Sequence, residues 1–212
     1  MALSDAKPGR DATTLPTIVY LHGFRSSPAS IKANAMASAV AALPRARRPR
    51  LHIPFLRDGP AASIAQTAAW VESNVPDPHR SLTLVGSSLG GYYATHLCER
   101  YRARAVVVNP AIRPYEDLAP YRGAQTNLHT GETFVVTDAH FDELRALQVT
   151  RLRDPGRYWL LVQTGDEVLD YRQAVAYYAS AHQLVEGGGD HAFVGFERQL
   201  GAILRFAGIE AR

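Results

Sequence analysis

The chain has 212 residues, of which 46% are hydrophobic and 20% are charged, a composition that suits a globular protein with a sizeable core. A single cysteine, Cys98, excludes an intramolecular disulfide framework. No stretch approaches the roughly 20 apolar residues that a membrane span needs, and the polar start of the chain lacks the apolar core of a secretion signal. These features predict a cytoplasmic protein without a membrane span.

Strand-like and helix-like segments alternate along most of the chain. A loose leader is expected at residues 1–16, ending at Pro16. Apolar, β-branched runs predict strands at 17–21, 50–56, 81–86, 104–110, 157–165 and 182–188. Helix-forming composition predicts helices at 27–43, 61–75, 90–101, 171–181 and 192–208. The first of these helices is expected to have Ser27 as its cap and Pro28 in its first turn.

This alternation predicts a single α/β domain over residues 17–212. Parallel strands need helical crossovers, and the crossovers cover both faces of the sheet. Four of the strands are continuous apolar runs, as doubly covered strands are. We therefore expect an open, mostly parallel sheet of about six strands with helices on both faces. In such sheets the functional site lies beyond the carboxyl ends of the strands.

One segment interrupts the alternation. Residues 111–150, between the fourth and fifth strands, are too long for a plain connection. We expect an insertion over the site, with a short hairpin near 130–136 and a helix from Phe141. Its apolar side chains either line a binding pocket or pack the insertion onto the domain, and the sequence favours neither. The candidates are Tyr115, Leu118, Tyr121, Phe134, Phe141 and Leu144.

The segment Gly86-Ser87-Ser88-Leu89-Gly90 fits the G-x-S-x-G pattern of a nucleophile elbow, placed between a predicted strand and a predicted helix. In this turn the residues two positions before and after the nucleophile come very close together, so side chains there would clash. Glycines occupy those positions around Ser88, whereas Val85 and Leu89 occupy them around Ser87. The pattern therefore indicates Ser88 as the nucleophile of an α/β-hydrolase fold. A tightly packed turn without catalysis is the alternative.

A nucleophilic serine needs a base, and the base needs an orienting carboxylate, in the chain order Ser, acid, His for this fold. Asp166 stands at the end of the fifth strand, in "QTGDEVLDY". Asp170 is its rival, but its place before a helix predicts an N-cap, and Glu167 is expected to face solvent. His191, after the three glycines of "EGGGDHAF", is the predicted base. The alternative for His191 is a local pairing with Asp190.

Two backbone amides are candidates for an oxyanion hole. The amide of Leu89 begins the helix after the nucleophile, where free N–H groups favour negative charge. The amide of Phe24 lies in the loop after the first strand, which gives the second contact in α/β-hydrolases. In the same loop, Gly23 lets the backbone approach substrate, and His22 is expected to brace the loop rather than react. No cluster of His, Cys, Asp or Glu has convincing metal-ligand spacing, and we expect neither a metal nor a cofactor.

The motifs "YLHGFRSSPAS", "GSSLGGYYATHL", "NPAIRPYEDL", "TGDEVLDY" and "GGGDHAFVGFE" together resemble the YqiA/YcfP-type esterases, small bacterial α/β-hydrolases. The match runs from about Ile18 to about Phe206. The resemblance implies a serine esterase that acts on acyl esters or on acyl-CoA thioesters. It also implies the roles of nucleophile, acid and base for Ser88, Asp166 and His191.

Other functions stay open from the sequence. A thioesterase or an acyltransferase would use the same three residues, and a ligand-binding protein on a hydrolase scaffold would typically lack one of them. The net charge of +3 includes a basic segment, "PRARRPR" at 44–50, which is a weak candidate for binding nucleic acid. Such charge runs are typical of a solvated loop. We expect a small-molecule acyl ester or acyl-CoA as the partner and no nucleic acid, and the oligomeric state stays undetermined.

Overall fold

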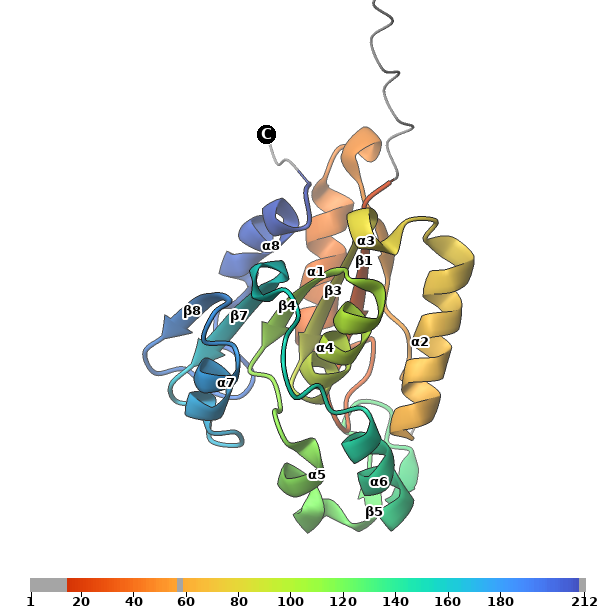
Figure 1. Cartoon of the computed structure of the whole chain (residues 1–212), viewed down its shortest axis with the longest axis vertical. Helices are drawn as coiled ribbons and strands as arrows, with labels where there is room; N and C mark the ends of the chain where they lie inside the picture. Colours follow the sequence, from red (N-terminus) through yellow and green to blue (C-terminus); the bar gives the residue numbers. More distant parts are fainter. Residues whose placement is uncertain (1–14, 57–58, 210–212) are drawn as a thin grey trace, which may run out of the picture.

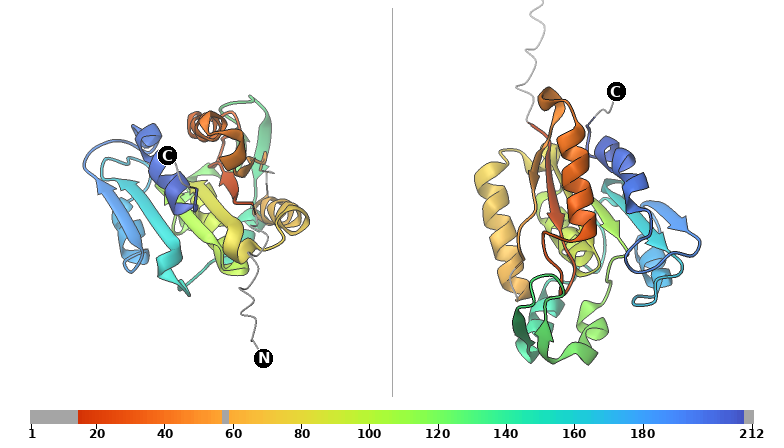
Figure 2. Two further views of the ribbon diagram at one scale, coloured as in Figure 1. Left: turned by 90° about the horizontal axis from the view of Figure 1, so that it is seen from above. Right: turned by 180° about the vertical axis from the view of Figure 1, so that it is seen from behind.

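The computed structural model describes residues 15–56 and 59–209. Six parallel strands form one sheet in the order β2-β1-β3-β4-β7-β8, with helices on both faces (Figures 1 and 2). The expected fold class is thus confirmed. The strands are β1 (Thr17–Leu21), β2 (Arg50–His52), β3 (Leu82–Ser87), β4 (Arg104–Val108), β7 (Tyr158–Gln163) and β8 (His182–Glu186). Most of the expected leader, residues 1–14, lies outside the described residues.

The helices form a layer on each face of the sheet. One face is covered by α1 and α8, and the other by α2, α4 and α7 (Figure 2). Outside the segment between β4 and β7, the α-helices are α1 (Ile31–Ala42), α2 (Pro60–Asn74), α3 (Pro78–Ser81), α4 (Leu89–Tyr101), α7 (Tyr171–Tyr177) and α8 (Leu200–Phe206).

Strand β1 shows how the sequence builds both layers. Its side chains alternate between the faces, so that Ile18 and Tyr20 join the apolar core under α1 and α8. Val19 and Leu21 join the larger core on the opposite face. All four are buried. A strand that contributes to two cores is apolar throughout, which explains the uninterrupted apolar runs of the sequence.

Two helices begin later than the sequence pattern predicts. The first helix begins at Ile31, and its cap is Ser30, whose hydroxyl accepts a hydrogen bond from the amide of Ala33. The predicted cap, Ser27, instead binds the amide of Ala29 in the preceding turn. At the end of the chain, Phe193 and Gly195 have positive φ values, which exclude them from a helix. That segment forms a 3-10 turn at Phe196–Gln199, and α8 follows it.

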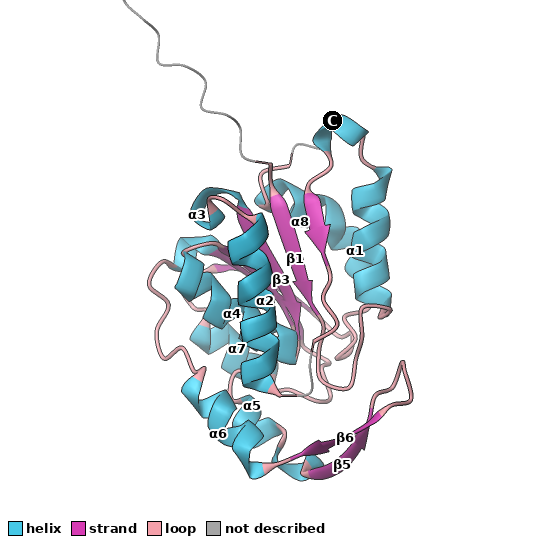
Figure 3. Ribbon diagram, turned by 90° about the vertical axis from the view of Figure 1, so that its right-hand side faces the viewer, coloured by secondary structure: helices cyan, strands magenta, loops and turns pink. Residues whose placement is uncertain are grey.

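The segment between β4 and β7 contains α5 (Pro114–Asp117), β5 (Gly123–Thr126), β6 (Thr133–Val136) and α6 (Asp138–Ala146). These elements lie beyond the carboxyl ends of the parallel strands (Figure 3). Strands β5 and β6 pair antiparallel and form a hairpin. This hairpin begins at Gly123, earlier than the segment 130–136 expected from the sequence. Helix α6 begins at Asp138 rather than Phe141, because Thr137 and His140 form a capping box at its start.

The tip of this hairpin binds the loop that follows β1. The side-chain amide of Asn127 donates to the carbonyl of Ser26 at 2.8 Å, and its side-chain oxygen accepts from the amides of His129 and Thr130. The amide of Leu128 donates to the carbonyl of Arg25 at 2.9 Å. The insertion is therefore joined to the loop that carries Gly23 and Phe24.

The basic segment at 44–50 lies at the amino end of β2, at the opposite end of the molecule from the insertion (Figure 1). Its Arg48 side chain donates hydrogen bonds to the carbonyls of Ala41 and Leu43, which end α1. Among the described residues, no helix combines the length and the apolar character that a membrane crossing requires.

Candidate active site

Ser88 occupies the turn between β3 and α4. Its φ of 55° and ψ of −123° are strained values for a residue with a side chain. A Cβ on Gly86 would lie 2.1 Å from the carbonyl oxygen of Gly90, and a Cβ on Gly90 would lie 2.1 Å from the carbonyl oxygen of Leu21. Both positions therefore require glycine. The preceding Ser87 ends β3 and is buried, with its hydroxyl at the phenol of Tyr20.

The side chains of Ser88, His191 and Asp166 form one chain of hydrogen bonds. His191 Nδ1 lies 2.9 Å from Asp166 Oδ2 and 3.0 Å from Oδ1. A carboxylate only accepts, so Nδ1 carries the proton and Nε2 is an acceptor. The Ser88 hydroxyl, 3.1 Å from Nε2, donates to it. These residues come from three separate strand ends, and the fold brings them together.

Asp166 is held as an ionised acceptor. Its side chain is only 2% exposed, and its Oδ1 accepts from the amides of Val168 and Leu169 at 2.9 Å each. Burial favours the neutral acid, but the hydrogen bonds from His191 and from these amides outweigh it and hold the pKa of Asp166 below its ordinary value. Asp170 has a different place: it caps α7 and accepts from an amide of the first turn.

The amides of Leu89 and Phe24 both lie next to Ser88. Leu89 begins α4 directly after the serine, and Gly23 packs so closely that a Cβ on it would lie 3.2 Å from the Ser88 Cβ. Among the described residues, neither the Leu89 nor the Phe24 amide has a hydrogen-bond acceptor. Two unpaired N–H groups beside a serine hydroxyl are the arrangement that stabilises an oxyanion.

His22 is buried and braces the loop after β1. Its Nδ1 donates to the carbonyl of Gly23 at 3.0 Å, and its Nε2 accepts from the amide of Leu56 at 3.1 Å. Burial lowers the pKa of His22, so the ring stays neutral and Nε2 remains an acceptor. This role agrees with the bracing that the sequence suggested.

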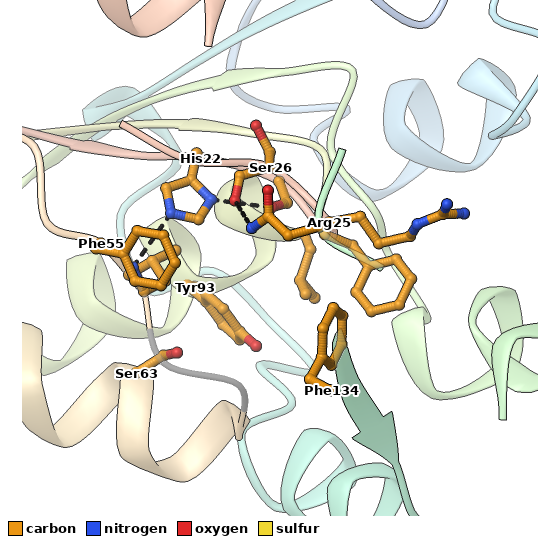
Figure 4. A pocket seen from close by; sticks show the side chains of 12 residues that line it. His22, Arg25, Ser26, Phe55, Ser63, Tyr93 and Phe134 are labelled. Atoms are coloured by element: carbon orange, nitrogen blue, oxygen red, sulfur yellow. Dashed lines mark hydrogen bonds between the residues drawn. The ribbon is translucent and has the colours of Figure 1, made fainter. Parts of the chain in front are cut away.

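Two hollows adjoin this loop. The larger one, which we call the cleft, has a volume of about 510 Å³ and contains the side chains of Ser88 and His191. The smaller one, which we call the recess, has about 50 Å³, and its lining includes Gly23 and Leu89. Figure 4 shows the recess with the side chains of His22, Tyr93 and Phe134 labelled on its wall. Aromatic side chains on the recess wall are Phe24, Phe55, Tyr93 and Phe134.

A model of the uncharacterised protein family UPF0227 matches residues 17–208, which is nearly the whole chain. The chain belongs to this family, the family of the YqiA and YcfP proteins. The resemblance seen in the sequence motifs is thereby confirmed.

Solved structures similar to this UPF0227 chain share its fold at low sequence identity. An Agrobacterium vitis protein provisionally classed as a hydrolase has a TM-score of 0.71 and 21% identity, covering 92% of this chain and 88% of its own. Mouse alpha/beta hydrolase domain-containing protein 10 gives 0.65 at 16% identity, covering 91% and 88%. The esterase Est1E of Butyrivibrio proteoclasticus gives 0.64 at 15% identity, covering 92% and 88%. These likenesses establish an α/β-hydrolase fold.

The aromatic residues predicted in the insertion occupy different places in this UPF0227 fold. Phe134, on β6, lines the recess and packs edge-on against Phe24. Tyr121 also packs edge-on against Phe24, but lines neither hollow. Tyr115 lies on α5, where Gln148 donates a hydrogen bond to its hydroxyl, and it lines neither hollow. One of the three is therefore placed to touch a ligand.

Sequence reasoning did not single out several residues of the site. Leu128, at the hairpin tip, lines the cleft, and so does Lys32 of α1. Asn109 and Gln163, at the ends of β4 and β7, bind the backbone around His191. The sequence places these two residues at the ends of predicted strands, but many residues with a purely structural role have the same position, so this signal alone could not identify them. Within the described residues, no group of three or more His, Cys, Asp or Glu side chains is arranged to hold a metal ion.

Proposed function

We propose that this protein is a serine esterase that hydrolyses acyl esters, including acyl-CoA thioesters, through an acyl-enzyme. The hydrogen-bond chain from Asp166 through His191 to Ser88, on a strained turn beside two unpaired amides, carries the proposal. Each part of the arrangement has a chemical task in acyl transfer, and a binding protein needs none of them. The family membership and the esterases among the structural neighbours support the same reaction class.

The first half of the reaction forms the acyl-enzyme. His191 Nε2 takes the proton of the Ser88 hydroxyl as the Ser88 oxygen attacks the acyl carbonyl. The carbonyl oxygen becomes an oxyanion, which accepts hydrogen bonds from the amides of Leu89 and Phe24. Asp166 accepts from Nδ1 and stabilises the imidazolium. The tetrahedral intermediate then collapses, and His191 gives its proton to the departing alkoxide or thiolate.

The second half returns the enzyme to its starting state. His191 removes a proton from a water molecule, which attacks the acyl carbon, and the oxyanion forms again in the same place. The Ser88 oxygen leaves with the proton from His191, and the carboxylic acid is released. The His191 side chain is 23% exposed, so water reaches Nε2 from the cleft. This access favours hydrolysis over transfer to another acceptor.

The size of the cleft fits a small-molecule substrate. Ligand sites commonly occupy roughly 300–1,000 Å³, and the cleft lies within that range at about 510 Å³. His191, from which the leaving group must receive its proton, is part of its lining. An alcohol or thiol portion of considerable size therefore has room there.

The test is a panel of p-nitrophenyl esters and acyl-CoA thioesters of increasing chain length, with Ser88→Ala as the control. We expect turnover by the unchanged protein and loss of turnover in Ser88→Ala. Intact-mass spectrometry after rapid quenching should detect the acyl adduct on Ser88. Absence of both turnover and adduct across the panel would refute the proposal, and equal turnover by Ser88→Ala would refute the assigned nucleophile.

A further inference from the structure

Asn109 lies beneath the candidate active site, buried and hydrogen-bonded to its backbone, without belonging to the Ser88, Asp166 and His191 chain. It directly follows β4, the strand between the one that carries Ser88 and the one that precedes Asp166. Its side chain is buried, and its φ of 40° is in the left-handed region. Asparagine is one of the few residues with a side chain that adopts this region readily.

Every polar group of the Asn109 side chain is used, and all the bonds go to backbone. Its Oδ1 accepts from the amide of Gln163 at 3.0 Å. Its Nδ2 donates to the carbonyl of Asp190 at 3.0 Å and to the carbonyl of His191 at 3.2 Å. One buried side chain thus joins the end of β7 to the backbone of the proposed base.

The residues on either side of Asn109 hold the serine turn. The carbonyl of Val108 accepts from the amide of Ser88 at 3.0 Å, and the amide of Ala111 donates to the Ser88 carbonyl at 3.1 Å. The segment 108–111 therefore contacts the backbone of Ser88 directly, while its Asn109 side chain contacts the backbone of His191. This short segment is therefore a direct link between the two residues, beside the hydrogen bonds that Gln163 and Glu167 accept from the backbone of the His191 loop.

The loop that carries His191 needs such an anchor. It begins with Gly187, Gly188 and Gly189, and the last two have φ values of 73° and 74°. Glycine gives a loop more accessible conformations than other residues do. A displacement of about 1 Å between reacting groups is enough to lower a rate by about 10²-fold, so catalysis requires the loop to be fixed.

We propose that Asn109 is a positioning residue, which fixes the His191 loop against the Ser88 turn and so sets the distance between Nε2 and Oγ. The inference rests on the proposed serine-esterase function. Position 109 requires a side chain that both accepts and donates hydrogen bonds, on a residue that adopts the left-handed backbone conformation. Asparagine meets both requirements. Aspartate has the same shape but lacks the donor, and its charge would face two carbonyl oxygens.

Two variants separate positioning from general stability. Asn109→Asp keeps the acceptor for Gln163 and removes the donor, and Asn109→Gly keeps the positive φ and removes the whole side chain. We expect kcat to fall by about 10²-fold in both, with KM changed by less than about threefold, because substrate contacts remain. The control is Ile203→Val, a change at a fully buried residue of α8 that lines neither hollow, and it should lower the melting temperature without a large loss of kcat.

A spectroscopic measurement tests the inference without using activity. The proton between His191 Nδ1 and Asp166 should give a downfield ¹H NMR resonance, assigned by its loss in Asp166→Asn. We expect it in the unchanged protein and in Ile203→Val, and we expect it broadened or lost in both Asn109 variants.

The outcomes distinguish the two proposals. If the Asn109 variants keep kcat and the resonance while only their melting temperature falls, the positioning role is wrong and the residue is structural. If the unchanged protein hydrolyses no ester and does not react with a fluorophosphonate, the proposed function fails, and the resonance alone then decides whether Asn109 holds His191 in place.

Discussion

A Cβ on Gly86 would lie 2.1 Å from the carbonyl oxygen of Gly90, much closer than any real contact allows. The two glycines lie on either side of Ser88 in the chain and meet across the turn between β3 and α4. Because neither residue has a side chain, the chain can make the tight turn in which Ser88 has a positive φ, whereas Ser87 is the last residue of β3. Two adjacent serines thereby occupy sites of different chemistry.

The first prediction separates these two serines. Ser88→Ala should reduce turnover by at least about 10³-fold, because Ser88 is the residue of the described chain whose hydroxyl hydrogen-bonds to His191 Nε2. Ser87→Ala should leave most of the activity, because the Ser87 side chain lies at Tyr20 in the strand. Steady-state kinetics and peptide mapping of a fluorophosphonate adduct measure both. An adduct on Ser87 would overturn the assignment.

The second prediction separates two aspartates. In Asp166→Asn, the side-chain oxygen should face the amides of Val168 and Leu169, leaving the NH₂ group against His191 Nδ1. Nε2 would then carry the ring proton and accept nothing from Ser88, so kcat should fall by about 10⁴-fold.

The matched control for this change is Asp170→Ala. It removes the cap of α7 and should cost about 1 kcal/mol of stability, with little change in kcat. Thermal unfolding and steady-state kinetics measure the two effects. A large kinetic loss in Asp170→Ala together with a small one in Asp166→Asn would reverse the two roles.

The third prediction concerns pH and His22. Burial lowers the folded-state pKa of His22, and those of His52 and His96, below the ordinary histidine value of 6.5. The unfolded chain therefore binds more protons as the pH falls through 6.5, so the free energy of unfolding should fall below that pH and stay level just above it. Protonation of His22 also removes the acceptor for the Leu56 amide.

Urea denaturation between pH 8 and pH 5 measures this dependence, with His22→Gln and His52→Phe as the variants. Each variant should show a shallower fall in stability below pH 6.5 than the unchanged protein, because one titrating group has been removed. If the free energy of unfolding depends on pH with the same slope in all three proteins, these rings have the same pKa in the folded and unfolded states, and the prediction is wrong.

The fourth prediction concerns the insertion. Phe134→Ala should enlarge the recess and shift the preferred acyl chain of the ester panel to greater length. Tyr115→Ala, which changes a residue on α5 away from both hollows, should lower the melting temperature and keep the chain-length profile. If both variants only lose stability, the aromatic residues are packing groups and the acyl chain binds elsewhere.

Patterns within short segments were sufficient to predict most of the fold. The six strands follow from apolar runs, and the glycine spacing identifies the turn at Ser88, because steric limits act between neighbouring residues. The capping position also distinguished Asp170 from Asp166. The predicted start of the last helix was wrong, because Phe193 has a positive φ. On either side of it, the amides of Asp190 and Val194 donate hydrogen bonds to the side-chain oxygen of Gln163, a residue far away in the sequence.

Side-chain roles that depend on packing between distant segments were not predictable in this way. Asn109 lies 82 residues before His191 in the chain, and nothing in the adjacent "VVVNP" indicates what its amide binds. Similarly, Tyr115 and Phe134 are both aromatic residues of the insertion, but Tyr115 lies on α5 and Phe134 lies on β6, and of the two only Phe134 lines the recess in the folded chain.

The hydrogen bonds from the hairpin tip to the loop after β1 limit how this scaffold is engineered. Exchanging residues 111–150 for the cap of another hydrolase would remove the donors that Asn127 and Leu128 provide to the carbonyls of Ser26 and Arg25. The Phe24 amide, in the same loop, would lose its support together with the old cap. A graft that preserves residues 126–131 and varies the helices on either side retains this support. These six residues therefore have to stay unchanged when the rest of the insertion is exchanged.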